Sequence, residues 1–456
     1  MKFNTRFFAL LLLLPLLAAA CVADDDTDIE PINLFSIQLN NAALSDGAED
    51  LPVAAEIGIT FSRALDPASF AMAFSLTSAS DNPVPDFTYA NQSSEVTIRA
   101  NLAFETTYTL RILSIPIAAD GGQLASEVSL SFTTREDGSI TSLPPCTSAT
   151  QNCLRTFTFA GSTGGDFQFY ASFPIYEDLA RWEAISAAII VVHGANRNGD
   201  DYFNYLMNAL RAAGLDDKVL VIAPIFKNAG EATANELFWS GNGWRDGRNA
   251  AAGSAVSSFS VVDQLITRLG DQTHFPVLEK IMVTGHSSGA LFTHLYAAAN
   301  QLEAALPALT FDYLVANSQY FYYPDGQRIN SNTNQLFTPS GCTGYDIWPL
   351  GYTVLPPYLS NTNRSTFNER FVARAVTYLL GNGNQSDPTL NTTDCSNTLL
   401  GPTRFARGEQ MFRYLELAYP GQQVHQKVVV DGVGHDGEGM YGSSTFRQLL
   451  NDFGGG

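Results

Sequence analysis

The most constraining feature of this chain is a short segment in which a tight glycine turn joins a strand to a helix. An apolar, β-branched run at 280–284 precedes the sequence GHSSG at 285–289, and a helix-favouring stretch at 290–296 follows directly. Glycine at both ends of the turn lets the chain bend sharply and lets the helix pack close to the strand. Ser287 is then exposed at the turn, above a helix N-terminus. A bare G-x-S-x-G occurs by chance, but this strand–turn–helix setting is that of a nucleophilic serine.

A serine hydroxyl is a poor nucleophile until a base accepts its proton, so a histidine must lie near Ser287. Of the six histidines, His435 lies in a glycine-rich loop after the last predicted strand. That loop falls at the carboxyl edge of the sheet, where ligands bind. The serine–acid–histidine chain order also places the histidine last. We therefore predict that His435 is the base. The remaining histidines are assigned to core packing, to the turn or to other loops: His193, His274, His286, His294 and His425.

Acyl transfer also needs two backbone N–H groups that face the developing oxyanion. One is expected from Ser288, the residue after the nucleophile. The other is expected from the loop after the third strand of the sheet, where Ala195 is the first choice and Asn196 the second. Gly194 lets this backbone approach a substrate.

From residue 155 onward, apolar runs alternate with longer segments. Several of these runs are almost continuously β-branched, which is typical of parallel strands buried on both faces. Eight strands with helical crossovers, and the serine turn after the fifth, predict a mostly parallel α/β-hydrolase sheet over 155–456. The predicted strands are 156–160, 167–173, 188–192, 219–226, 281–284, 313–317, 376–380 and 428–430.

Residues 31–135 have a different sequence pattern, in which short runs of alternating apolar and polar residues, typical of strands, are separated by turn residues. Even spacing without a helical period predicts an all-β sandwich. The wording ITFSRALD at 59–66, LAFETTYTL at 102–110 and SFTT at 131–134 resembles the bacterial Ig-like domain of surface-layer and exported proteins. The segment contains no cysteine or histidine, so we interpret it as a spacer, with carbohydrate or polymer binding as the alternative. Residues 136–154 are interpreted as a linker.

The N-terminus has the pattern of a targeting segment. Lys2 and Arg6 precede an apolar stretch at 7–17 and small residues at 18–20. The segment resembles a bacterial lipoprotein signal, which implies removal of 1–20, lipidation of Cys21 and an acidic tether at 21–30. Ala18 departs from the leucine of that pattern, and ordinary secretion with cleavage after residue 20 is the alternative.

The cysteine count agrees with a lipidated Cys21 in an oxidising compartment. Four cysteines then remain, an even number suited to two disulfides. Cys146 and Cys153 are close in sequence and can close a small loop, in which case Cys342 pairs with Cys395 across a long one; the sequence alone leaves this connectivity open. No Cys-x-x-Cys or Cys/His cluster suggests a metal, and no cofactor is expected.

The strongly negative net charge limits which classes of partner the protein can bind. The net charge is −20, and the chain has only five lysines: Lys2, Lys218, Lys227, Lys280 and Lys427. Nucleic acid and anionic membrane surfaces would be repelled, so the only membrane contact that we predict is a lipid anchor at Cys21.

From residue 189 to the end, the chain resembles exported bacterial and fungal α/β-hydrolase esterases. The shared wording is HGANRN at 193–198, WRDG at 244–247, SSF at 257–259, RFARG at 404–408 and GVGHD at 432–436. The resemblance implies an aspartate just after the seventh strand. The earliest position there holds Asn384, and the first carboxylate is Asp387. We predict Asp387 as the acid of the triad, with Asn384 and Asp394 as alternatives.

Together these features predict an exported bacterial enzyme, lipid-anchored or secreted, that cleaves carboxylic esters through an acyl-enzyme. A polyester or polyhydroxyalkanoate depolymerase is the alternative within hydrolases. The rival from another class is a surface binding or adhesion protein with an inactive hydrolase domain. The presence of the serine, the histidine and the oxyanion residues argues against that rival.

Overall fold

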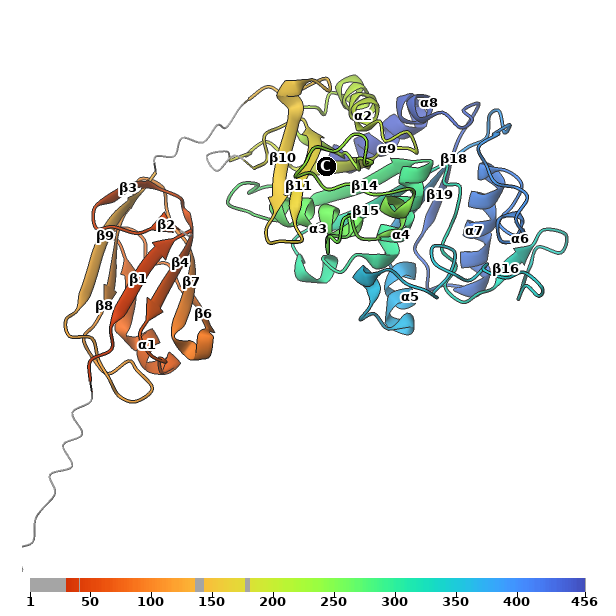
Figure 1. The fold of residues 1–456 in the computed structure, drawn as a ribbon. Coiled ribbons are helices and arrows are strands. Elements are labelled where there is room, and N and C mark those ends of the chain that lie inside the picture. Colours follow the sequence, from red (N-terminus) through yellow and green to blue (C-terminus); the bar gives the residue numbers. More distant parts are fainter. Residues whose placement is uncertain (1–29, 41, 136–142, 177–180, 456) are drawn as a thin grey trace, which may run out of the picture. The chain divides into compact units, whose positions relative to one another are not determined.

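The computed structural model describes residues 30–40, 42–135, 143–176 and 181–455 (Figure 1). The chain divides into two compact units, Met1–Glu136 and Asp137–Gly456. The expected signal segment, the lipidated Cys21 and all of the tether except Glu30 lie outside the described residues. So does the first part of the expected linker, 136–142.

The N-terminal unit is a sandwich of two sheets. Alternate residues of its central strand β4 (Ala54–Phe61) are buried, and Ile57, Ile59 and Phe61 enter the core. One sheet has the order β2 (Ala42–Ala43), β1 (Leu34–Leu39), β4, β7 (Glu95–Asn101) and β6 (Asp86–Ala90). The other has the order β3 (Ala48–Leu51), β9 (Val128–Thr134), β8 (Thr107–Ile112) and β5 (Phe74–Thr77).

One helix of this unit, α1 (Pro67–Ala73), was not expected from its strand-like pattern. Asp66 begins it, because its carboxylate accepts a hydrogen bond from the Ser69 N–H, and Pro67 suits the first helical position. A helix of 7 residues is too short to give a clear helical period in the sequence.

The C-terminal unit is built on a sheet of eight strands among the described residues. The six strands from β13 to β19 in the sheet order are parallel, and β10 and β11 are antiparallel to their neighbours. All eight strands predicted from the sequence are present, with ends that differ by a few residues. In sheet order they are β10 (Leu154–Phe159), β11 (Gly165–Ala171), β13 (Val219–Pro224), β12 (Ala187–Val192), β14 (Lys280–His286), β15 (Thr310–Ala316), β18 (Ala375–Gly381) and β19 (Gln426–Val430).

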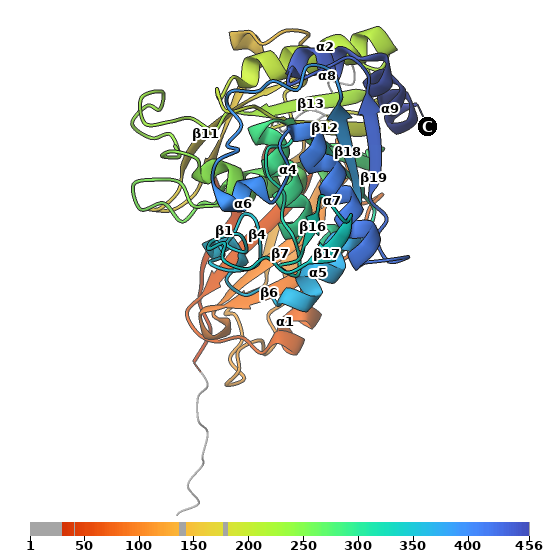
Figure 2. The same cartoon turned by 90° about the vertical axis from the view of Figure 1, so that its right-hand side faces the viewer.

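Helices cover both faces of this sheet (Figure 2). Alternate residues of β12 enter different cores: Ile189 packs with α2 (Gly199–Ala213), α8 (Gly437–Gly442) and α9 (Ser444–Gly454). Ile190 packs on the other face with α3 (Ser258–Leu269), α4 (Ser288–Ala299), α5 (Arg364–Val372) and α7 (Arg404–Ala418). The shorter elements are α6 (Cys395–Thr398), β16 (Arg328–Asn330), β17 (Gln335–Phe337) and 3₁₀ turns at Asn91–Ser93, Gln151–Cys153, Gly243–Asp246, Glu303–Ala305 and Pro357–Leu359.

Two disulfides close loops of the C-terminal unit. Cys146 pairs with Cys153, and Cys342 pairs with Cys395 across 53 residues. The structure therefore confirms two disulfides and settles their connectivity. In the described residues, no helix has the length and apolar character of a membrane span.

Candidate active site

Ser287 lies in a strained turn between β14 and α4. Its φ of 60° and ψ of −113° fall in a region that residues with a side chain rarely occupy. Strain of this kind costs about 1–3 kcal/mol and clusters at functional sites. The N–H of Ser287 donates to the carbonyl of Ala316 in β15 at 3.0 Å, and its own carbonyl accepts from Leu291 in α4 at 3.2 Å, so the neighbouring strand and the following helix both hold the turn.

The two glycines of the turn are required by close backbone contacts. A Cβ on Gly285 would collide with the backbone of Gly289, and a Cβ on Gly289 would collide with the Val192 and His193 carbonyls. The first turn of α4 therefore packs directly against the end of β12. This explains why the sequence has glycine on both sides of Ser287.

His435 and Asp387 meet at the carboxyl edge of the same sheet, where β19 and β18 end. Nδ1 of His435 lies 3.2 Å from Oδ2 of Asp387. The Asp387 side chain is 6% exposed, and that of His435 is 26% exposed. Oδ1 of Asp387 accepts hydrogen bonds from the Thr389 N–H at 2.9 Å and the Thr389 hydroxyl at 2.6 Å. The carboxylate is thus held by its own loop while its other oxygen faces the imidazole.

The two alternative acids have other partners. Asn384 is exposed, and its side-chain oxygen accepts from the Ser386 N–H at 3.0 Å. Asp394 accepts from the Asn391 side chain at 2.6 Å and precedes the short helix α6. Of the three candidates, Asp387 is the one whose recorded contacts include His435.

The environment favours a neutral His435 and an ionised Asp387. Burial lowers the pKa of His435 to about 4, and the Arg404 cation adds to this, although Asp387 and Asp436 oppose it. Burial alone would raise the pKa of Asp387, but hydrogen bonds from Thr389 and Arg404 outweigh it and lower this pKa to about 2. A neutral imidazole beside a fixed carboxylate is the resting state that a general base requires.

Two further side chains lie behind His435 in a stack, and sequence analysis did not identify either of them as part of the site. The ring of His286, the variable residue of the turn, lies 5.0 Å from the His435 ring at an angle of 28°. The Tyr202 hydroxyl of α2 lies 3.1 Å from Nδ1 of His286. Burial keeps the pKa of His286 well below its usual value, so this ring is a neutral, flat surface against His435.

The loop after β12 is held by His193 and Arg197. His193 is buried, and its Nε2 accepts from the Phe226 N–H at 3.1 Å. Arg197 donates to the carbonyls of Phe226 at 2.6 Å and Gly241 at 2.5 Å. Ala195 is exposed at the tip of this loop, and Ser288 is buried at the start of α4. The oxyanion assignment of these last two residues stays a prediction.

A cavity of about 210 Å³ adjoins the turn. Of its lining residues, Leu291 lies one helical turn after Ser287, and Arg245 donates to the Ser288 hydroxyl at 3.2 Å, so the cavity lies near Ser287, although Ser287 does not itself line it. Its wall combines apolar and polar side chains: Asn242, Arg245, Asp246, Leu291, Tyr320, Pro349, Leu350 and Asn397. The other aromatic residues near the site are core residues: Trp239, Trp244, Phe321, Tyr322 and Tyr323.

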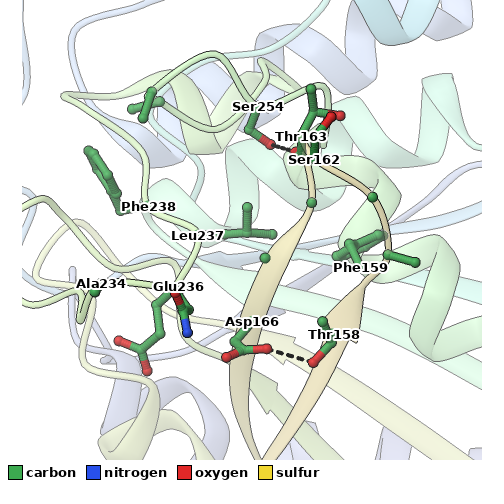
Figure 3. A pocket seen from close by; sticks show the side chains of 17 residues that line it. Thr158, Phe159, Ser162, Thr163, Asp166, Ala234, Glu236, Leu237, Phe238 and Ser254 are labelled. Carbon is green, nitrogen blue, oxygen red and sulfur yellow. Dashed lines mark hydrogen bonds between the residues drawn. The ribbon is translucent and has the colours of Figure 1, made fainter.

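A larger cavity of about 470 Å³ lies elsewhere, between the β10–β11 turn and the segment 234–254 (Figure 3). Its rim is fixed by hydrogen bonds from Thr158 to Asp166 and from Ser254 to the Thr163 carbonyl. None of the recorded lining residues is shared with the cavity beside Ser287, and none belongs to the predicted site.

Three of the remaining histidines have structural partners. Nε2 of His294 accepts from the Tyr322 N–H at 2.9 Å within the core. Nδ1 of His425 lies 3.0 Å from the Tyr378 hydroxyl, and His274 pairs with Asp271 at 2.8 Å. No group of three or more histidine, cysteine, aspartate or glutamate side chains suited to a metal occurs in the described part of the chain.

Comparison with known proteins identifies the N-terminal unit. Residues 36–134 match the family of bacterial Ig-like domains, which is less than half of the chain. The prediction of an Ig-like domain is confirmed. No curated protein matches the chain.

Solved structures resemble the C-terminal unit at low identity. The poly(3-hydroxybutyrate) depolymerase LpqC from Bordetella parapertussis is 20% identical, with a TM-score of 0.47 over 66% of this chain and 90% of that one. Poly(aspartic acid) hydrolase-1 from Sphingomonas sp. KT-1 is 16% identical, with a TM-score of 0.45 over 66% and 98% of the two chains. The siderophore hydrolase EstB from Aspergillus nidulans is 13% identical, with a TM-score of 0.35 over 67% and 96%. The strand order and the turn after the fifth strand agree with the predicted α/β-hydrolase fold class.

Proposed function

We propose that this chain is a serine hydrolase that cleaves carboxylic esters through Ser287, His435 and Asp387. The contact between His435 and Asp387 is the observation that supports this most. These residues come from the loops after β19 and β18, and Ser287 follows β14 in the same parallel sheet. Since parallel strands end at one edge, the three groups gather there from distant parts of the sequence.

The proposed reaction has two halves. His435 takes the proton of the Ser287 hydroxyl as the serine oxygen attacks the ester carbonyl, and the backbone N–H groups of Ser288 and Ala195 stabilise the oxyanion. The alcohol leaves with the proton from His435, which leaves an acyl group on Ser287. A water molecule, activated by His435, then releases the acid, while Asp387 stabilises the imidazolium in both halves. Each step uses side chains or backbone groups of this chain together with water, and we propose no metal or organic cofactor.

The cavity beside Ser287 limits the substrate. Its volume of about 210 Å³ is below the roughly 300–1,000 Å³ of sites that enclose a drug-sized ligand. We therefore expect kcat/KM to be highest for p-nitrophenyl esters of short acyl chains and to fall as the chain lengthens. A series of such esters and a polyester film, each compared with the Ser287→Ala variant, tests this. Serine-dependent release from the film without turnover of any small ester would favour the polyester depolymerase instead.

The strained backbone at Ser287 speaks against the rival of a binding or adhesion protein. Ser287 is 7% exposed and therefore buried, not exposed as the sequence predicted, and a strained turn that costs about 1–3 kcal/mol is typical of a functional site rather than of a purely structural one. The rival would gain support if neither the esters nor the film were hydrolysed and the protein bound the film in the same way with and without Ser287.

We further propose that the protein is located at the bacterial cell envelope, anchored by a lipid on Cys21. The Ig-like domain and the two disulfides support an extracellular or envelope location. If Cys21 is lipidated, the protein should partition into detergent with the membrane fraction, and Cys21→Ser should release it or block its processing. Recovery of a mature chain in the culture medium that begins with an unmodified Cys21 or with Val22 would support ordinary secretion instead.

A further inference from the structure

Helix α7 carries two buried arginines, one turn apart, that have different partners. The guanidinium of Arg407 is bound by backbone carbonyls, among them Gly401 at 2.9 Å and Gln319 at 2.6 Å. The guanidinium of Arg404 instead donates through Nε to Oδ2 of Asp387 at 2.6 Å. The side chains of Arg404 and Asp387 are 5% and 6% exposed, so this ion pair is largely shielded from water.

Arg404 and His435 share one oxygen of Asp387. Oδ2 lies 2.6 Å from Nε of Arg404 and 3.2 Å from Nδ1 of His435, while Thr389 binds Oδ1. The contact with the arginine is the shorter of the two. The carboxylate therefore has a permanent cation beside it even when the imidazole is neutral.

Arg404 also connects the loops that carry the triad. Its Nη1 donates to the carbonyl of Asn317, which follows β15 and has a φ of 49°. The Asn317 side chain donates to the Gly434 carbonyl at 2.8 Å and accepts from the Gly381 N–H at 2.8 Å. One buried network thus joins the end of β18, the loop before His435 and the start of α7.

We propose that Arg404 is a positioning residue of the hydrolase, which fixes Asp387 and shares its charge so that His435 remains a neutral base in mild acid. The inference rests on the proposed function. It assigns a role to the RFARG segment, which the sequence linked to esterases without indicating a reason.

The charged groups around His435 determine how it responds to pH. Asp387 and Asp436 favour the imidazolium, whereas burial and the Arg404 cation oppose it, and the stacked His286 ring is held neutral by its own burial. A base is active above its pKa, so a lowered pKa of His435 extends activity toward acid. Without Arg404, the full charge of Asp387 would favour the imidazolium, and the acid limb of activity would move to higher pH.

The test is the pH dependence of kcat/KM, between pH 4 and 8, for a short p-nitrophenyl ester. We expect half-maximal activity of the parent below pH 5. In Arg404→Gln the acid limb should move up by about one pH unit or more, because a buried neighbouring charge is removed. Arg404→Lys retains the cation, so the acid limb of its pH profile should lie near that of the parent. Arg407→Gln, the same change at an equally buried arginine that donates to backbone carbonyls instead of Asp387, is the matched control and should leave the acid limb in place.

Two results would overturn the inference. One is an unchanged acid limb in a folded Arg404→Gln variant, which would leave Arg404 with a structural role alone. The other needs no variant: if fluorophosphonate inactivation of the parent has its acid limb between pH 6 and 7, as for an ordinary histidine, His435 is not held neutral in acid. Loss of labelling in Ser287→Ala combined with either result would reject the role of Arg404 while leaving the proposed hydrolase intact.

Discussion

Replacing Ser287 with alanine is expected to abolish ester hydrolysis and labelling by a fluorophosphonate probe. The probe reacts only with a serine whose hydroxyl is activated by a base, and Ser287 is the serine at the strained turn between β14 and α4. In comparable enzymes, loss of the nucleophile costs about 10⁶-fold in turnover. Activity with a soluble ester and in-gel fluorescence after labelling measure the two effects.

The matched control is Ser254→Ala, which removes a hydroxyl from the rim of the distant cavity. This hydroxyl donates to the Thr163 carbonyl at 2.8 Å and does not face the proposed site. Labelling of this variant should equal that of the parent. Continued labelling of a folded Ser287→Ala protein would mean that another residue is the nucleophile, and the assignment of the triad would be wrong.

Asp387→Ala is expected to lower kcat by several hundredfold or more. The imidazolium that forms during catalysis needs nearby negative charge, and loss of the carboxylate in comparable triads costs around 10⁴-fold. The effect is reinforced here because Arg404 would be left as an unpaired buried cation near His435. Turnover of a soluble ester measures the loss, and the melting temperature shows how much of it reflects unfolding.

Three variants separate the carboxylate from its surroundings. Asp387→Asn retains an oxygen that can accept from Thr389 but loses the charge. Its kcat should therefore be nearly as low as that of Asp387→Ala. Asn384→Ala and Asp394→Ala should each have much smaller effects, since neither side chain has a recorded contact with His435. If Asp387→Ala stayed within about tenfold of the parent while one of the other two lost its activity, the acid would have been misplaced.

The parts of the site that local patterns determine were visible in the sequence. Ser287 could be identified because its neighbours alone specify the strand, the two close-packed glycines and the helix. His435 followed from chain order and from its place after the last strand. The acid of the proposed triad was harder to predict from the sequence, because its position depends on how the loop after β18 folds. There the hydrogen bonds of Thr389 to Asp387 direct the carboxylate, and such side-chain turns leave little trace in composition.

The residues that sequence reasoning missed reach the proposed site through contacts between segments that are far apart in the sequence. Tyr202 and His286 come from α2 and β14, 84 residues apart, and their contact depends on the packing of α2 against the sheet. Arg404 was noticed only as part of a shared segment. An arginine buried beside a carboxylate breaks the hydrophobic pattern of its helix, so periodicity cannot distinguish it from a solvent-exposed residue.

The disulfide between Cys342 and Cys395 joins two segments that line the cavity near the start of α4. Pro349 and Leu350 lie a few residues after Cys342, Asn397 lies two residues after Cys395, and all three line the cavity beside Ser287. The crosslink therefore ties two walls of this cavity together, although 53 residues separate the two cysteines. A chain held in a reducing cytoplasm would contain every residue of the proposed triad but would lack the bond between these walls. If the protein is exported as proposed, the bond between these walls forms only after the chain has left the cytoplasm, so the cavity reaches its final covalent form outside the compartment of synthesis.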